Sequence, residues 1–189
     1  FQFSALRHDL TSIFLVLPPN RLDAYSRWLR LLVAQALQDI ARDAEAAQAG
    51  SERLKQPALF LLDEFAALGR LEAVERAMGL MAGYGLQLWP ILQDMSQLRD
   101  LYGARANTFV ANAGVLQTFG VNDFETAKWL SQSMGKETIG YQTESHRPGD
   151  IATTTQHIAA RDLMTPDEIM QIDPSVQLLR VQGKPVIIA

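Results

Sequence analysis

The chain has 189 residues, no cysteine and a formal net charge of −4 at pH 7. Its length suits one domain with a sizeable core, and the absence of cysteine excludes a disulfide framework and a thiolate metal site. The acidic balance argues against a protein that coats nucleic acid indiscriminately, but it is compatible with a local basic patch. No apolar run approaches the ~20 residues that a membrane span needs, and no signal peptide is visible.

The first expected elements are a strand and a long helix. Residues 11–17 are rich in β-branched and aromatic side chains and end at two prolines, which predicts a strand. Asn20 is the expected N-cap of a helix over 21–49, in which apolar residues recur every three or four positions. Gly50 is expected to end that helix.

Two adjacent carboxylates follow the next apolar run. Residues 58–62 read Ala-Leu-Phe-Leu-Leu, which predicts a strand buried on both faces, and Asp63 and Glu64 come directly after it. Open α/β sheets bind ligands at the carboxyl ends of their strands. The pattern is typical of a Walker B strand, in which the first acid holds Mg²⁺ and the second orients or deprotonates the attacking water. The alternative is a core strand whose Asp63 caps the following helix.

The middle of the chain alternates helices with strands, which predicts an α/β fold with a mostly parallel sheet flanked by helices. The expected elements are a helix over 71–82, a strand over 86–92, a helix starting near Ser96, a helix over 107–112, a strand over 115–119 and a helix over 124–134. Gly83 and Gly85 follow a helix, so they are expected to cap and turn it rather than cradle a phosphate. Gln93 follows its strand at the position that Asp63 occupies one strand earlier.

The last quarter of the chain changes in character. Residues 137–161 are rich in threonine and poor in large apolar side chains, which predicts a β-hairpin or an exposed, partly disordered excursion. Residues 165–168 read Thr-Pro-Asp-Glu and predict a helix start with a capping box. Two short strands, 176–181 and 186–188, are expected to close the chain.

Several short motifs occur together in a fixed order. They are Leu62–Phe65, Ala66–Glu72, Met81–Gly85, Gln93–Leu98, Tyr102–Gly103, Asn122–Asp123 and Thr126–Ala127. This series resembles the TraG-type coupling proteins of type IV secretion and conjugation, which are hexameric ATPases at the inner membrane. The resemblance covers nearly the whole chain. It implies that residues 1–189 are the C-terminal part of a RecA-like nucleotide-binding domain, with 137–161 as a hairpin excursion and a phosphate-binding loop lying earlier.

The resemblance also implies a catalytic site for ATP and Mg²⁺. Asp63 is the implied metal ligand, and Glu64 is the implied catalytic residue that handles the attacking water. Gln93 is the implied polar sensor of the γ-phosphate, because its amide can contact both phosphate and water.

Two parts of a working ATPase are not evident in the sequence. No Gly-x-x-x-x-Gly-Lys-Ser/Thr occurs in the chain, so it is not expected to cradle a triphosphate by itself. Some relatives carry a trans-acting arginine near the end of the helix after the Walker B strand, where this chain has 81–83 without arginine. Arg70, Arg76 and Arg105 are candidates by proximity only.

The implied function is that of a motor-domain portion of a coupling protein that uses ATP hydrolysis to recruit and export DNA or protein substrates. The implied partners are other subunits in a ring, relaxase-bound single-stranded DNA or secreted effector proteins, and secretion-channel components. The implied location is the cytoplasmic face of the bacterial inner membrane, with membrane attachment only through upstream segments. Two alternatives remain open: a docking module derived from this domain that hydrolyses nothing, and an FtsK-like translocase of double-stranded DNA.

Overall fold

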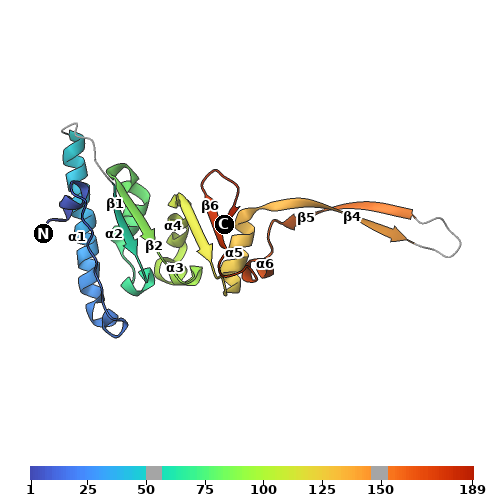
Figure 1. The fold of residues 1–189 in the computed structure, drawn as a ribbon, viewed down its shortest axis with the longest axis horizontal. Helices are drawn as coiled ribbons and strands as arrows, with labels where there is room; N and C mark the ends of the chain where they lie inside the picture. The colour runs from blue at the N-terminus through green and yellow to red at the C-terminus, as the bar shows by residue number, and fades with distance from the viewer. Residues whose placement is uncertain (50–56, 146–152) are drawn as a thin grey trace. The chain divides into compact units, whose positions relative to one another are not determined.

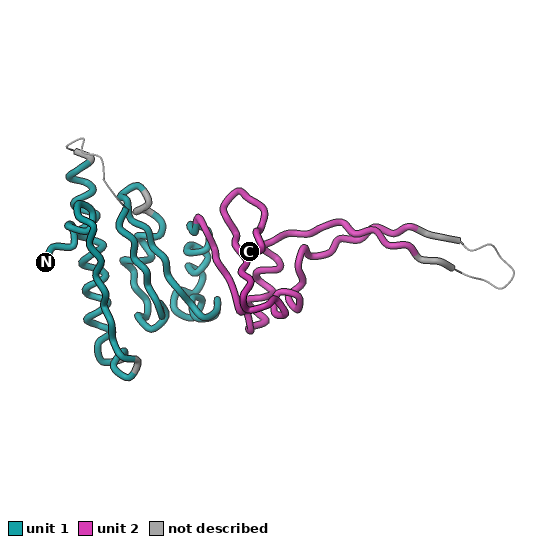
Figure 2. Tube along the Cα trace, in the orientation of Figure 1, with its two compact units in different colours: residues 1–113 teal, residues 114–189 magenta. Residues whose placement is uncertain are grey.

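The computed structural model describes residues 1–49, 57–145 and 153–189 (Figure 1). The chain divides into two compact units, residues 1–113 and 114–189 (Figure 2). Each unit has its own strands, helices and buried apolar side chains. Gly50, the expected end of the first long helix, lies outside the described residues.

Unit 1 begins with the 3-10 helix η1 (Phe3–Arg7), the turn η2 (Pro19–Arg21) and the long helix α1 (Leu22–Ala49). The helix is confirmed, although Asn20 lies in η2 rather than directly before it. The prediction of a strand over 11–17 is wrong, because this segment is not a strand and no described strand pairs with it. Its β-forming side chains, such as Phe14 at 85% exposure, cannot make a strand without a neighbour that satisfies the backbone.

One face of α1 packs into the core of unit 1. Its buried apolar residues are Leu29, Val33, Ala36, Leu37, Ile40 and Ala44. This spacing of three and four confirms the predicted apolar face. Helix η1 is held against α1 by an ion pair. Arg7 of η1 is buried, and its Nη1 lies 2.6 Å from Oδ2 of Asp43 in α1.

The centre of unit 1 is a parallel strand pair. Strand β1 (Ala58–Leu62) pairs with β2 (Leu86–Pro90) along its whole length. The helix predicted between them is present as α2 (Glu72–Leu80) followed by η4 (Met81–Tyr84). The resulting strand–helix–strand unit brings the carboxyl ends of both strands to one edge.

The prediction that β1 is buried on both faces is wrong for the described chain. Ala58 and Leu62 are buried, whereas Leu59 and Leu61 are 55% and 56% exposed. Trp89, the register partner of Leu61, is also about half exposed. The described residues therefore cover one face of the pair and leave the other open.

Three short segments complete unit 1: α3 (Met95–Tyr102), η5 (Gly103–Arg105) and α4 (Ala106–Asn112). They carry two rings of an aromatic cluster whose third ring belongs to η3 (Phe65–Leu68), directly after β1. The ring centroids are 6.0 Å apart for Phe65 and Tyr102, and 4.5 Å apart for Tyr102 and Phe109. All three rings are buried, so this cluster fixes the segment that follows β1.

Unit 2 contains an antiparallel sheet with the order β3 (Val115–Phe119), β6 (Gln177–Val181) and β7 (Ile187–Ile188). Helices α5 (Phe124–Met134) and α6 (Pro166–Met170) pack on it through a core of Ala127, Leu130, Ile169 and Leu178. The mixed α/β class is thus confirmed, with parallel pairing in unit 1 and antiparallel pairing in unit 2 among the described strands.

The predicted excursion is a long two-stranded ribbon of β4 (Lys136–Ser145) and β5 (Thr153–Asp162) (Figure 1). On one of its faces the ring of Tyr141 stacks on His157, with centroids 5.2 Å apart. At its base Arg161 bonds to Glu137 and Glu168, the latter in α6. The hairpin is confirmed for the described residues, and 146–152 lie outside them.

Helix α6 begins with the predicted capping box. Glu168 Oε2 accepts a hydrogen bond from the Thr165 backbone N–H at 2.8 Å. This backbone bond, together with the Thr165 hydroxyl and the Arg161 guanidinium, lowers the pKa of the Glu168 carboxyl. Glu168 is therefore more stabilised as a carboxylate in the folded state than in the unfolded state.

This pKa shift predicts a pH-dependent contribution to stability. A lowered folded pKa means that the contribution is present above the ordinary glutamate pKa and is lost as the pH falls through the folded value. We expect Glu168→Gln to lower the thermal midpoint near neutral pH, and the difference from wild type to shrink below about pH 4. Asp167→Asn is the control, because it changes a neighbouring charge and leaves the capping bond intact. An unchanging difference from neutral to acidic pH would contradict the assignment.

Candidate functional site

Asp63 and Glu64 lie where the parallel strand pair ends. The hydrogen bonds between the two strands continue past the last paired residues, since Ile91 N–H donates to the Leu62 carbonyl at 3.0 Å and Phe65 N–H donates to the Ile91 carbonyl at 3.1 Å. The loop after β1 is thereby tied to the loop after β2. Both carboxylates between these anchor points are exposed.

Glu64 has a left-handed backbone conformation, with φ 47° and ψ 44°. Among the described residues it is the one non-glycine residue with positive φ. For an L-residue this conformation costs on the order of 1–2 kcal/mol, and such strain concentrates at functional sites. The next residue, Phe65, is fully buried, so its packing holds the turn that presents Glu64 to solvent.

The side chain of Asp63 folds back on this turn. Its Oδ1 accepts a hydrogen bond from the Glu64 backbone N–H at 3.0 Å. The alternative of a helix cap is not what the structure contains, because the N-cap of η3 is Glu64 and makes no side-chain capping bond. Asp63 keeps its second carboxylate oxygen for other partners, and both acids offer the hard oxygen donors that Mg²⁺ prefers.

Gln93 lies at the same edge of the sheet, two residues beyond Ile91. Its backbone N–H donates to Gln97 Oε1 at 3.1 Å, and its own side chain is exposed. The helix-capping role belongs instead to Asp94, which accepts from the Gln97 N–H at 2.9 Å. The side-chain amide of Gln93 is therefore not the cap of α3, although its backbone N–H bonds to Gln97 in the first turn.

Tyr102 supports this turn, although its place in the Tyr102–Gly103 motif gave no sign of that role. The Tyr102 hydroxyl accepts a hydrogen bond from the Leu71 backbone N–H at 3.0 Å, which anchors the link between η3 and α2. Burial raises the pKa of Tyr102, so it stays a neutral phenol. The partners are 31 positions apart, and a lone tyrosine on an apolar helix face gave no local indication of the contact.

The three candidate arginines differ in their surroundings. Arg70 and Arg105 both approach Glu75, at 3.6 Å and 2.7 Å. Arg76 is exposed and makes no hydrogen bond or ion pair to the described residues. The structure thus brings together two of the three arginines that proximity in sequence suggested.

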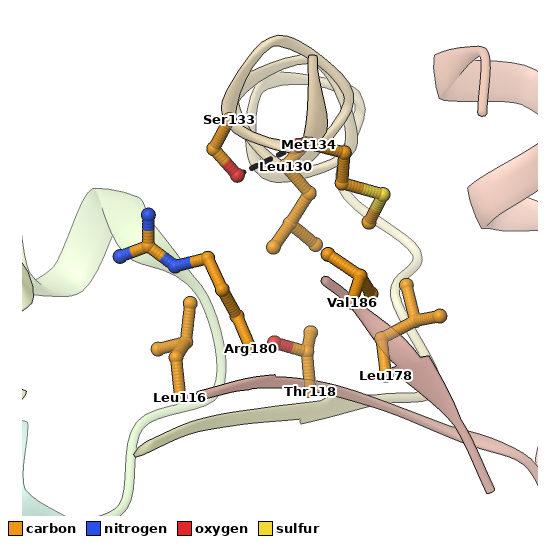
Figure 3. Close-up of a pocket in the computed structure, with 8 residues that line it drawn as sticks. All are labelled: Leu116, Thr118, Leu130, Ser133, Met134, Leu178, Arg180 and Val186. Carbon is orange, nitrogen blue, oxygen red and sulfur yellow. Dashed lines mark hydrogen bonds between the residues drawn. The ribbon is translucent and has the colours of Figure 1, made fainter. Parts of the chain in front are cut away.

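Unit 2 contains a small space with a mostly apolar lining and no carboxylate. It lies between α5 and the antiparallel sheet (Figure 3) and is lined by Leu116, Thr118, Leu130, Ser133, Met134, Leu178, Arg180 and Val186. The space fits about one water molecule, so it is a packing gap rather than a ligand site. Elsewhere in the described ranges, no three histidine, aspartate or glutamate side chains gather as a metal site, and no helix has the length and apolar character that crossing a membrane requires.

A family model decides what kind of protein carries this site. The model of the type IV secretory system conjugative DNA transfer family matches residues 1–189. The chain belongs to this family. This confirms the resemblance to the TraG-type coupling proteins.

Two relatives give the extent of the similarity. The chain is 29% identical over 188 residues to Protein VirD4 of Rhizobium radiobacter, covering 98% of this chain and 27% of the relative. It is 31% identical over 186 residues to the conjugal transfer protein TraG of Escherichia coli, covering 91% of this chain and 29% of the relative. The chain therefore spans less than a third of either relative.

Solved structures of the coupling protein TrwB share the fold. An unbound form of TrwB lacking its N-terminal segment superposes with a TM-score of 0.78 and 20% identity, over all of this chain and 43% of TrwB. TrwB in complex with ADP and Mg²⁺ gives a TM-score of 0.74 at the same identity, over 42% of its chain. This likeness confirms the predicted RecA-like α/β fold.

The strained turn predicts an unusual response to glycine. Glycine adopts positive φ without a Cβ penalty, so Glu64→Gly should leave the free energy of unfolding unchanged or raise it by up to ~1 kcal/mol. Glu64→Val should lower it by at least ~1 kcal/mol, because a β-branched side chain tolerates positive φ poorly. Urea unfolding followed by circular dichroism measures both.

Glu72→Gly is the matched control for this experiment. Glu72 is an exposed glutamate in the first turn of α2, with helical backbone. Glu72→Gly should lower the free energy of unfolding by roughly 0.5–1 kcal/mol, a change opposite in sign to that expected of Glu64→Gly. If Glu64→Gly destabilised the chain as much as Glu72→Gly, the backbone at Glu64 would not be strained.

Proposed function

We propose that this chain is the C-terminal part of the RecA-like motor domain of a type IV secretion coupling protein and carries the acids of its ATPase site. The observation that carries the proposal is the parallel register of β1 and β2, with Leu62 opposite Pro90. This register puts the ends of both strands at one edge, and Asp63, Glu64 and Gln93 follow those ends with exposed side chains. Ligands of open α/β sheets bind at such an edge.

Asp63 is the proposed ligand of Mg²⁺. An exposed carboxylate with one oxygen already bonded to the Glu64 N–H can offer the other oxygen to the ion or to its bound water. Mg²⁺ bound to a nucleotide neutralises charge on the phosphate oxygens. TrwB, which shares the fold, has been solved with ADP and Mg²⁺, and this supports a nucleotide and Mg²⁺ as the ligands of the proposed site.

Glu64 and Gln93 are the proposed groups that handle water and phosphate. Glu64 follows the end of β1 in a left-handed turn, and its exposed carboxylate can accept a proton from the attacking water. Gln93 offers an amide N–H to a phosphate oxygen and an amide oxygen to water, and it approaches from the neighbouring strand. Since Asp94 caps α3, moving the Gln93 side chain breaks no described capping bond.

The wider role follows from the family. A coupling protein recruits DNA or protein cargo, and we propose that this chain works within a ring of identical subunits at the inner membrane, next to the secretion channel. The phosphate cradle must come from elsewhere, because the chain has no Gly-x-x-x-x-Gly-Lys-Ser/Thr. A phosphate-binding loop upstream would favour the ATPase over the second candidate, a docking module that binds partners and hydrolyses nothing.

The proposal predicts separate effects of the two acids in the full-length protein. Glu64→Gln should lower ATP turnover by at least ~100-fold while ATP binding stays close to wild type, since only the proton-accepting group is lost. Asp63→Asn should raise the Mg²⁺ concentration needed for half-maximal binding. Phosphate release and equilibrium binding of a fluorescent ATP analogue measure these effects.

Glu125→Gln is the control, because it removes one exposed carboxylate from α5 in unit 2 and leaves the three proposed residues unchanged. It should turn over ATP like the wild-type protein. Wild-type turnover by Glu64→Gln would contradict the role proposed for Glu64, whereas no turnover by the wild-type full-length protein would favour the docking module.

A further prediction concerns the isolated 189-residue chain. We expect no ATP-dependent rise in its melting temperature and no turnover above its own Glu64→Gln variant. The reason is that phosphates are held by a row of backbone N–H groups and a lysine, and this motif is absent from the chain. A longer chain with an upstream strand, loop and helical domain should bind ATP. Micromolar ATP binding by the short chain would show that its phosphate site lies within residues 1–189.

A further inference from the structure

Three arginines from separate segments of unit 1 meet near the start of α2. Arg105, at the end of η5, donates from Nη1 to Glu75 Oε1 at 2.7 Å. Arg70, between η3 and α2, has its Nη2 3.6 Å from Glu75 Oε2. Arg30, in α1, donates from Nη2 to the Arg70 carbonyl oxygen at 2.9 Å. We name the side chains of Arg30, Arg70, Arg105 and Glu75 the arginine cluster.

The charges within the cluster do not balance. In the part of the chain that the structure describes, Glu75 is the one carboxylate within 4 Å of Arg70 or Arg105. The other charged residues of α2, Glu72 and Arg76, cancel each other. By contrast, Arg161 in unit 2 forms ion pairs with two carboxylates, those of Glu137 and Glu168. The arginine cluster therefore keeps an excess of positive charge in a chain whose formal net charge is −4.

The carboxylate lies inside the cluster and the guanidinium groups lie outside. The side chain of Glu75 is 12% exposed, whereas those of Arg70 and Arg105 are 46% and 63% exposed. Glu75 Oε2 is buried and makes no hydrogen bond to the described residues. Each guanidinium has five N–H donors, so most donors of Arg70 and Arg105 remain available to a ligand from solvent.

Tyr102 shows that the cluster is compact. Burial raises the pKa of its phenol, and the charges of Glu75, Arg70 and Arg30 also act on that pKa. These three side chains therefore lie near one hydroxyl, which itself binds the Leu71 backbone N–H next to Arg70. Glu75, Arg70 and Arg30 therefore lie beside the buried aromatic core, and Arg105 joins them through Glu75.

A paired guanidinium fork matches the geometry of a phosphate group. Arginine binds phosphate oxygens in a bidentate manner, and charge-assisted hydrogen bonds of this kind are the stronger ones. Exposed ion pairs add little stability, so a role in folding alone would not require two arginines on one carboxylate. We propose that Arg70 and Arg105, oriented by Glu75 and backed by Arg30, form a phosphate-binding site that uses none of the proposed ATPase residues. The phosphate can be the phosphodiester of single-stranded DNA or the phosphate of a nucleotide.

The test uses the full-length protein with Arg70→Ala and Arg105→Ala combined. Fluorescence anisotropy with a labelled oligo(dT), without nucleotide, measures the first source of phosphate, and a fluorescent ATP analogue measures the second. We expect affinity for one of the two probes to fall by about tenfold or more, as loss of charge-assisted hydrogen bonds implies. If the probe is DNA, the dependence of affinity on salt should also weaken by one or two counterions.

Two control variants make the result specific. Arg76→Ala with Arg99→Ala removes the same charge from exposed arginines of α2 and α3 and should change either affinity less than about twofold. Arg70→Lys with Arg105→Lys keeps positive partners for Glu75 but loses the fork, so it should melt like wild type and still bind more weakly. The oligo(dT) measurement needs neither Asp63 nor Glu64, so it is independent of the ATPase proposal.

Each outcome bears on the site. A loss confined to oligo(dT) assigns the phosphodiester, and a loss confined to the ATP analogue assigns a nucleotide phosphate. Wild-type affinity of the alanine pair for both probes would overturn the proposal. So would an equal loss in the Arg76 and Arg99 control, because the effect would then be one of overall charge.

Discussion

The parallel pairing of β1 and β2 is the constraint on which the candidate site depends. The two strands share one register from Ala58 opposite Leu86 to Leu62 opposite Pro90, so they end together. Two more hydrogen bonds, through Ile91, then bind the segments that leave the sheet. Parallel strands need a crossover to run in the same direction, and α2 with η4 provides it. Polar residues far apart in sequence thereby share one edge.

Rigid packing beneath this edge is what allows a strained residue to persist above it. The left-handed turn at Glu64 is unfavourable by itself, and an isolated peptide would leave it. Here the turn is held between the buried ring of Phe65 on one side and the end of β1 on the other. Tyr102 serves both purposes at once, since its ring stacks on Phe65 and its hydroxyl holds Leu71. One aromatic cluster therefore supports the acid pair and the start of α2.

Local patterns predicted most of the elements. The three-and-four spacing of α1, the apolar run of β1 and the Thr-Pro-Asp-Glu start of α6 are each contained in a few consecutive residues, and each is present in the structure. Residues 11–17 have equally strong strand propensity but no partner strand in the described chain, because pairing is not a local property. The arginine cluster was not predicted for the same reason, because the contacts of Arg105 and Arg30 join positions 30 and 40 residues apart. The acids of the proposed site could be named from sequence because they are neighbours; their support could not.

The uncovered face of the strand pair has a consequence for the chain in dilute solution. Leu59, Leu61 and Trp89 expose about half of each side chain to water on that face. Apolar surface of this kind lowers its free energy by meeting other apolar surface, whatever its source. The modest net charge of −4 gives only weak mutual repulsion between copies. These three side chains therefore favour association between copies of the chain, and polar substitutions on that face, or a partner that covers it, should improve the solubility of the chain.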